Sequence, residues 1–147
     1  MSEDQAKIIN HTITRLLSRR EHSQFELIQK LVARDLDEKL CYKQLQFFID
    51  RRIQCDQRYV EAYVRSAFLK GKGPQVIRQT LSQHNIEGVQ VNDNIYREEY
   101  DWYNLAEVVR EKRFGEAPPV DFIDKQKQMC FLQYRGFEQA HIKAAAG

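Results

Sequence analysis

The sequence predicts an all-helical protein built from three tandem, stacked three-helix repeats. Two observations carry this prediction. Apolar residues recur at helical spacing along most of the 147 residues, and one short pattern returns three times at a nearly constant period. Only three prolines and six glycines interrupt these stretches. Each repeat is too small to bury its own apolar stripe, so the repeats are expected to pack against their neighbours.

Apolar stripes predict the individual helices. Residues 9–17 place apolar side chains at i, i+4, i+7 and i+8, which is one face of a helix. The same spacing returns in residues 41–49 and, slightly varied, in residues 60–68. A shorter stripe covers residues 105–109. We expect each stripe to contribute to a helical core.

Residues that commonly begin helices precede several of these segments. Ser23 is positioned to cap a helix that starts QFELIQKL, with Glu26 at the offset of a capping box. Asp56 stands where it can cap the helix that contains RYVEAYVRSAFL. Gly73 and Pro74 open PQVIRQTL, where a proline in the first turn loses no hydrogen bond. These residues are therefore assigned structural roles.

The repeated pattern is a leucine, four residues, a large apolar residue and then an acid. It occurs as LVARDLD in residues 31–37, LSQHNIE in 81–87 and LQYRGFE in 132–138, at spacings of 50 and 51 residues. Gly136 suits the left-handed position that closes many helices, so the pattern predicts the turn between the second and third helices of a repeat. The predicted repeats cover about residues 6–55, 56–98 and 99–147 of one repeat-built domain.

Residues 87–95, EGVQVNDNI, have a composition that departs from this scheme. The valines at 89 and 91 alternate, and glycine, asparagine and aspartate surround them, so propensity alone favours a strand or a loop. The segment nevertheless occupies the place of the third helix of the second repeat. The repeat pattern therefore predicts a short helix here.

Composition excludes several classes of protein. The net charge is only +2, which gives no overall attraction to nucleic acid. No stretch approaches the roughly 18 apolar residues of a membrane-spanning helix, and MSEDQAKII lacks the features of a secretory signal. We therefore expect a cytoplasmic protein that is not bound to a membrane. Cys41, Cys55 and Cys130 form no metal-binding spacing and are expected to be reduced and mostly buried.

No catalytic arrangement is visible in the sequence. The histidines at 11, 22, 84 and 141 lie on different segments without partners at metal-ligand or triad spacing. We expect them at the surface or at helix ends. The stretch KGKG, residues 70–73, does not belong to a nucleotide-binding GxxxxGK[ST] loop. The sequence therefore predicts a protein that is not an enzyme and that holds neither a cofactor nor a metal.

Three blocks of the chain resemble the RecX family, regulators of the RecA recombinase, in its proteobacterial form. These blocks are RREHSQFELIQKL, DQRYVEAYVRSAFLKGKGPQVIRQTLSQHNI and the stretch from DWYNLAEVV to FEQAHI, which together lie within about residues 6–142. The resemblance implies that the three repeats stack into an elongated, curved single chain. It also implies a non-enzymatic protein that lies along the groove of the RecA–DNA filament. It further implies suppression of the ATPase, strand exchange and growth of that filament. A monomer is expected, because the repeats can bury one another.

Basic residues recur in the corresponding place of each repeat. An arginine precedes the leucine by 16 residues in the first two copies, at Arg15 and Arg65, and by 22 in the third, at Arg110. Stacked repeats would align these clusters along one edge, which suits an acidic protein groove or phosphates. The residues predicted to bind the partner along this edge are Arg15, Arg19, Arg20, Arg65, Lys70, Lys72, Arg78, Arg110, Lys112, Arg113, Tyr134 and Arg135.

Other interpretations of these basic residues stay open. Cations near helix C-termini offset the helix dipole by about 0.3–1 kcal/mol each and aid solubility. The same residues could make the chain a sequence-nonspecific DNA-binding module or accompany RecA binding with weak DNA contact. The chain could also be a generic helical scaffold.

Two further predictions concern the contacts between repeats. Arg58 follows Asp56 in the family's Asp-x-Arg-aromatic pattern and is expected to form an ion pair between repeats. The aromatic run YREEYDWY, residues 96–103, is expected in the core between repeats two and three rather than as a base-stacking platform. The structural set is therefore Ser23, Asp56, Arg58, Gly73, Pro74 and Gly136.

Overall fold

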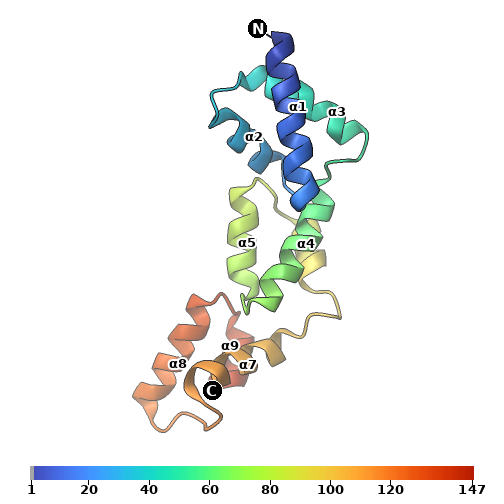
Figure 1. The fold of residues 1–147 in the computed structure, drawn as a ribbon. Coiled ribbons are helices and arrows are strands. Elements are labelled where there is room, and N and C mark those ends of the chain that lie inside the picture. Colours follow the sequence, from blue (N-terminus) through green and yellow to red (C-terminus); the bar gives the residue numbers. More distant parts are fainter. Residues whose placement is uncertain (1) are drawn as a thin grey trace. The chain divides into compact units, whose positions relative to one another are not determined.

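A computed structural model describes residues 2–147, and all regular secondary structure within them is helical (Figure 1). The helices are α1 (Ser2–Arg19), α2 (Gln24–Val32), α3 (Glu38–Asp50), α4 (Asp56–Leu69), α5 (Pro74–Gln83), α6 (Val89–Ile95), α7 (Trp102–Phe114), α8 (Phe122–Tyr134) and α9 (Gln139–Ala146). The predicted all-helical class is confirmed. The chain divides into two compact units, one ending at Ala62 and the other running from Tyr63 to Gly147. The boundaries at residues 55 and 98 stay predictions.

The first unit packs α1 against α2 and α3 around one apolar cluster. The predicted stripes supply this cluster, because each helix turns its apolar face inward. Its most deeply buried members are Ile9, Ile13, Leu27, Leu31, Cys41 and Leu45. Ser23 stands at the N-cap of α2, where its hydroxyl accepts a hydrogen bond from the backbone N–H of Glu26.

The structure corrects the predicted role of Asp56. Asp56 is the first residue of α4 and not its cap, because the carbonyl of Cys55 already accepts the Tyr59 N–H. The Asp56 carboxylate instead accepts the backbone N–H of Gln24, at 2.9 Å, and the amide of Gln54, also at 2.9 Å. It therefore satisfies a free donor at the start of α2, a helix far from it in sequence.

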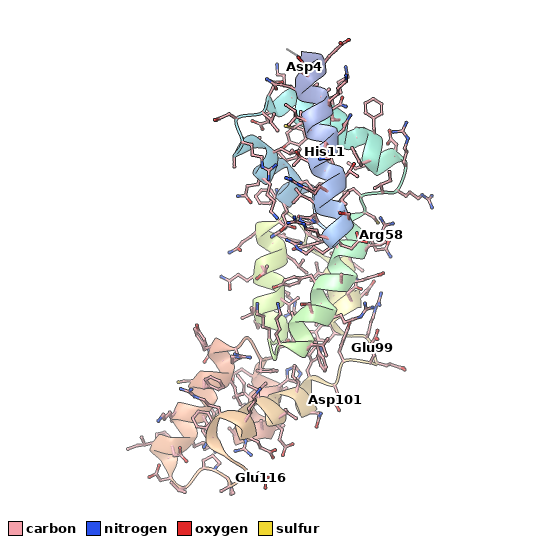
Figure 2. All side chains as sticks on the ribbon, viewed as in Figure 1. Asp4, His11, Arg58, Glu99, Asp101 and Glu116 are labelled. Carbon is pink, nitrogen blue, oxygen red and sulfur yellow. The ribbon has the colours of Figure 1, made fainter. Side chains whose placement is uncertain are left out.

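Arg58 joins three segments of the first unit (Figure 2). Its guanidinium forms an ion pair with the Glu21 carboxylate, and Nε lies 3.2 Å from Glu21 Oε1. Its Nη2 donates to the carbonyls of Arg52 and Ile53, at 2.8 and 2.9 Å. The guanidinium thus fastens the α3–α4 loop beside the α1–α2 loop.

The three repeated patterns form the same turn. Asp35, Asn85 and Gly136 all have positive φ, at 62°, 60° and 96°, and each follows the leucine of its pattern by four residues. These leucines are Leu31, Leu81 and Leu132, and all three are fully buried. The three turns connect α2 to α3, α5 to α6 and α8 to α9, which are the second and third helices of each predicted repeat. Residues 89–95 form the predicted short helix, in which Val91 and Ile95 are buried one turn apart.

In the second unit, α7 packs against α8 and α9, and two loops meet at a pair of glycines. The Gly73 N–H donates to the Arg135 carbonyl, and the Gln75 N–H donates to the Gly136 carbonyl, both at 2.8 Å. Gly73 is the N-cap of α5, and Pro74 occupies the first turn as predicted. The α4–α5 loop and the α8–α9 loop are thereby joined through their backbones.

The aromatic run divides between core and surface. Trp102 is buried, donates from Nε1 to the Ile95 carbonyl, and packs with Phe68 and Tyr100 at centroid distances of 5.1 and 5.9 Å. Tyr96 and Tyr103 are about half exposed, so the core prediction is wrong for them. Aromatic residues favour burial, but the backbone position of each residue decides which ones face the core.

The cysteines are less buried than the sequence predicts, and two of the histidines lie at helix ends as predicted. Cys41 is buried, whereas Cys55 is partly exposed and Cys130 is exposed, and all three are free thiols. His22 and His141 lie at helix ends but are buried. Within residues 2–147, no helix combines the length and the apolar composition that crossing a bilayer requires.

Burial of His22 predicts that acid destabilises the protein. Its ring contacts the Arg20 carbonyl at 2.9 Å and Lys30 Nζ at 3.3 Å. Burial lowers the pKa of His22 below its ordinary value of 6.5, and it outweighs the hydrogen bond with the Arg20 carbonyl, which raises the pKa. The charges of Arg20 and Lys30 lower the pKa further, while the charge of Glu26 raises it. The unfolded chain therefore binds this proton more readily than the folded chain. The free energy of unfolding should fall as the pH drops below 6.5, by at most about 1.4 kcal/mol per pH unit, and level off below the folded pKa.

Urea unfolding followed by circular dichroism at pH 7 and at pH 5 measures this effect. His22→Gln should reduce the difference in stability between the two pH values, because glutamine does not titrate. His11→Gln is the matched control, since His11 is exposed on α1. An unchanged pH dependence in His22→Gln contradicts the prediction.

Candidate partner-binding site

A groove in the second unit lies where the end of α4 meets α7 and α8, and its volume is about 400 Å³. We call it the basic groove. Its apolar lining consists of Leu69, Leu105, Val108, Val109 and Phe131. Its basic lining consists of Lys70, Lys112, Arg113 and Arg135, and Gly71 completes it.

The register of α7 explains why apolar residues line an open groove. Trp102, Ala106 and Arg110 follow one another at four-residue spacing and are the buried residues of this helix. The apolar stripe of Leu105, Val108 and Val109 lies on the neighbouring face of α7, and Val108, the member farthest around the helix from the buried residues, remains 48% exposed. Leu105 and Val109 are partly buried, so the expectation of burial is wrong only for Val108. Lys112 continues the stripe by one turn and brings a charge to the groove.

Phe131 places two arginines of the groove close together. The Cζ atoms of Arg113 and Arg135 lie 5.4 and 6.0 Å from the centre of its ring. Phe114 packs edge-on against the same ring at 5.5 Å. Cation–π contacts of this kind contribute about 0.5–1 kcal/mol at exposed sites. They hold two positive charges near one aromatic surface.

Arg135 also fixes the opposite wall of the groove. Its Nη2 donates to the Lys70 carbonyl at 2.7 Å, and its Nε donates to the Gly71 carbonyl at 3.3 Å. These bonds satisfy carbonyls at the end of α4, where a helix leaves acceptors without partners. Arg135 thus sets the position of the loop that carries Lys70.

Arg110 does not belong to a partner-binding edge. Its side chain is only 4% exposed, and Nη1 lies 3.3 Å from the Ala117 carbonyl and 3.4 Å from Gln128 Oε1. Its Nη2 lies 3.9 Å from the Glu111 carboxylate. Carbonyls of the α7–α8 loop and a side chain of α8 accept hydrogen bonds from Nη1, which offsets part of the cost of burying this charge. The prediction that Arg110 contacts a partner is wrong, and its role is to hold this loop.

Arg78 is largely engaged inside the second unit. It hydrogen-bonds the Tyr96 hydroxyl, donates to Asn92 Oδ1 at 3.1 Å and lies 4.0 Å from Glu138. The Tyr96 hydroxyl in turn donates to Glu138 at 2.8 Å. These contacts tie α5 and α6 to the start of α9.

The remaining predicted residues vary in exposure. Arg65 on α4 and Tyr134 at the end of α8 are exposed, whereas Lys72 is partly buried. In the first unit, Arg15 and Arg19 are exposed on α1, and Arg20 forms an ion pair with Glu26. Sequence reasoning missed the apolar lining of the basic groove. Its only signal was that Lys112 continues the 105–109 stripe.

Comparison with known proteins identifies the family. Residues 56–93 match the second three-helix domain of RecX, and residues 99–145 match the third. The regulatory protein RecX of Halorhodospira halophila is 36% identical over 148 residues, covering 99% of this chain and 92% of that protein. The chain belongs to the RecX family. The regulatory protein RecX of Acinetobacter baylyi is 38% identical over 88% of this chain and 80% of that protein.

Solved structures of RecX proteins share the fold. A crystal structure of regulatory protein RecX matches 97% of this chain and 71% of its own, with a TM-score of 0.78 at 23% identity. That of RecX from Lactobacillus salivarius matches 97% of this chain and 95% of its own, with a TM-score of 0.76. The family prediction made from the three sequence blocks is confirmed. The chain is accordingly a regulator and not an enzyme.

Proposed function

We propose that the chain binds the RecA nucleoprotein filament and inhibits its ATPase activity, strand exchange and growth during recombination and DNA repair. Membership of the RecX family is the observation that carries this proposal, because the resemblance implies RecA as the partner. The basic groove supports it physically. Four cations around an apolar lining suit a protein surface better than they suit a small metabolite. The proposal places the protein in the cytoplasm, as a monomer, and requires no cofactor.

A titration of RecA ATPase activity tests this function. RecA on single-stranded DNA should lose ATP hydrolysis when the protein is added at well below one copy per RecA, because one bound regulator affects neighbouring protomers. The rate of ATP hydrolysis is measured against the concentration of added protein. An unchanged rate at an excess of the protein contradicts the proposal.

Direct DNA binding is the second candidate function. The exposed cations Arg15, Arg19 and Arg65 favour it, because such residues can contact phosphates. The net charge of +2 argues against DNA binding as the main role. If it is the main role, binding to naked DNA should be tight, and log K should fall with log salt by about 0.9 per phosphate contacted.

A further inference from the structure

We infer that the basic groove binds an acidic protein segment that carries a large apolar side chain between its carboxylates. The inference rests on the proposed function only in taking the RecA filament as the source of that segment. The groove itself lies within the second unit and can be tested without RecA. The observations that carry it are the apolar lining, the sign of the charges and the arrangement around Phe131.

The apolar lining of the basic groove favours a ligand with an apolar group. Leu69 is 78% exposed and Val108 is 48% exposed, so both leave aliphatic surface in water. Covering such surface is favourable because it removes apolar area from water. The volume of about 400 Å³ lies at the small end of the range for ligand pockets, which fits one or two large side chains.

The positive charges around the groove favour a ligand that carries carboxylates next to its apolar group. Lys70, Lys112, Arg113 and Arg135 line it, and no acidic side chain is among its lining residues. Arg113 can bind a carboxylate through paired, charge-assisted hydrogen bonds. Arg135 adds its positive charge, since its Nε and Nη2 already donate to the carbonyls of Gly71 and Lys70. An acidic segment would therefore be attracted from solution and fixed in register. A neutral apolar segment would leave four like charges close together without compensation.

The surroundings of Phe131 favour a protein segment over nucleic acid. Binding of single strands usually relies on aromatic faces on which bases stack. The Phe131 ring already packs against Phe114 and lies beneath the guanidinium groups of Arg113 and Arg135. A sugar–phosphate backbone also offers no large aliphatic group to cover Leu69 and Val108. The carboxylate and apolar groups of a peptide match both parts of the lining.

Fluorescence anisotropy with a labelled twelve-residue peptide tests the inference. The probe contains one phenylalanine and one leucine flanked by glutamates and aspartates, and two matched peptides replace either the acids or the apolar residues with serine. The acidic apolar peptide should bind at least about tenfold more tightly than either matched peptide, because each lacks one half of the recognition. Failure of the probe to bind, or equal binding of the peptide without apolar residues, overturns the inference.

Variants of the full chain locate the binding. Val108→Asp should weaken binding of the probe peptide at least about tenfold, because the new carboxylate repels the acids of the peptide. Val108 is about half exposed, so the fold should tolerate the substitution. Lys127→Glu is the control, since Lys127 is exposed on α8 and does not line the groove. Equal weakening by both variants overturns the inference. A labelled oligothymidine is compared with the peptide in the same assay. If it binds more tightly than the peptide, and Val108→Asp abolishes that binding, the groove is assigned to nucleic acid instead.

The two proposals fail in different ways. If the peptide binds the groove but RecA keeps its ATPase activity, the proposed function fails and the groove assignment stands. If RecA is inhibited but the peptide does not bind, the groove assignment fails alone. If both hold, excess peptide should restore ATP hydrolysis to RecA inhibited by this protein, and inhibition that persists at saturating peptide excludes the groove as the RecA-binding surface.

Discussion

Gly136→Ala should lower the free energy of unfolding of the second unit by about 2–5 kcal/mol, because two separate costs add. Gly136 has φ of +96°, a conformation that L-amino acids with a side chain rarely adopt. An added Cβ would also lie 2.6 Å from Val76 Cγ2 and 2.7 Å from the Val76 backbone nitrogen. Relieving the contact would separate the Gly136 carbonyl from the Gln75 N–H that it accepts.

Two other glycines separate these costs. Gly73 has φ of −87°, which any residue tolerates, but an added Cβ would lie 2.4–2.5 Å from backbone atoms of Gly136 and Phe137. Gly73→Ala therefore tests the close approach alone. It should lower the free energy of unfolding by about 1–3 kcal/mol, because the added Cβ meets backbone atoms. Gly115 has φ of +92° with open space around it, so Gly115→Ala tests backbone strain alone, at about 1–2 kcal/mol.

Urea unfolding followed by tryptophan fluorescence measures all three variants. Trp102 is the only tryptophan of the chain and is buried against Phe68 and Tyr100, so its emission reports on the second unit. Gly136→Ala should be the least stable of the three, if the costs add. If Gly136→Ala is as stable as Gly115→Ala, the α4–α5 and α8–α9 loops do not approach each other as closely as the structure shows.

The repeat pattern in the sequence was sufficient to predict local structure. The spacing of LVARDLD, LSQHNIE and LQYRGFE predicts three equivalent turns, and Asp35, Asn85 and Gly136 all adopt positive φ there. It also predicts the short helix at 89–95 against the propensity of its residues. Such features depend on hydrogen bonds between residues close in sequence, which a short pattern specifies.

Contacts between distant segments were beyond sequence reasoning. The approach of Gly73 to Gly136 depends on which loops meet, and nothing near Gly73 records it. Asp56 looks like a cap for its own helix, but its carboxylate accepts the N–H of Gln24. Arg110 looks like part of an exposed cluster, yet it is buried and its Nη1 donates to carbonyls of the following loop. Charge and spacing alone did not distinguish a buried arginine from the exposed Arg113.

The basic groove could not be predicted from the sequence for a related reason. The stripe at 105–109 has the spacing of a buried face, and periodicity cannot tell a buried face from an exposed apolar one. The burial of Trp102, Ala106 and Arg110 settles the register of α7 in the structure. Lys112 and Arg113, which the sequence assigned to the basic edge, then lie in the same groove as Arg135, from α8.

Lys112→Glu combined with Arg113→Glu should raise the concentration needed for half-inhibition of the RecA ATPase at least about tenfold. Both residues line the basic groove and are exposed, so the fold should tolerate the change. Reversing two charges on an interface turns two attractions into two repulsions, and like charges brought together at an interface cost several kcal/mol. The measurement is the same ATPase titration, and an unchanged Trp102 emission confirms that the second unit remains folded.

Lys127→Glu combined with Lys143→Glu is the matched control. It makes the same change in net charge within the second unit, at exposed residues that do not line the groove. If inhibition depends on the groove, the control should inhibit like the unchanged chain, because only groove charges would face the partner. Equal losses in both variants would mean that net charge, rather than the groove, carries the inhibition. Loss of naked-DNA binding with full RecA inhibition in the groove variant would assign these cations to phosphates, because the two surfaces would then be separate.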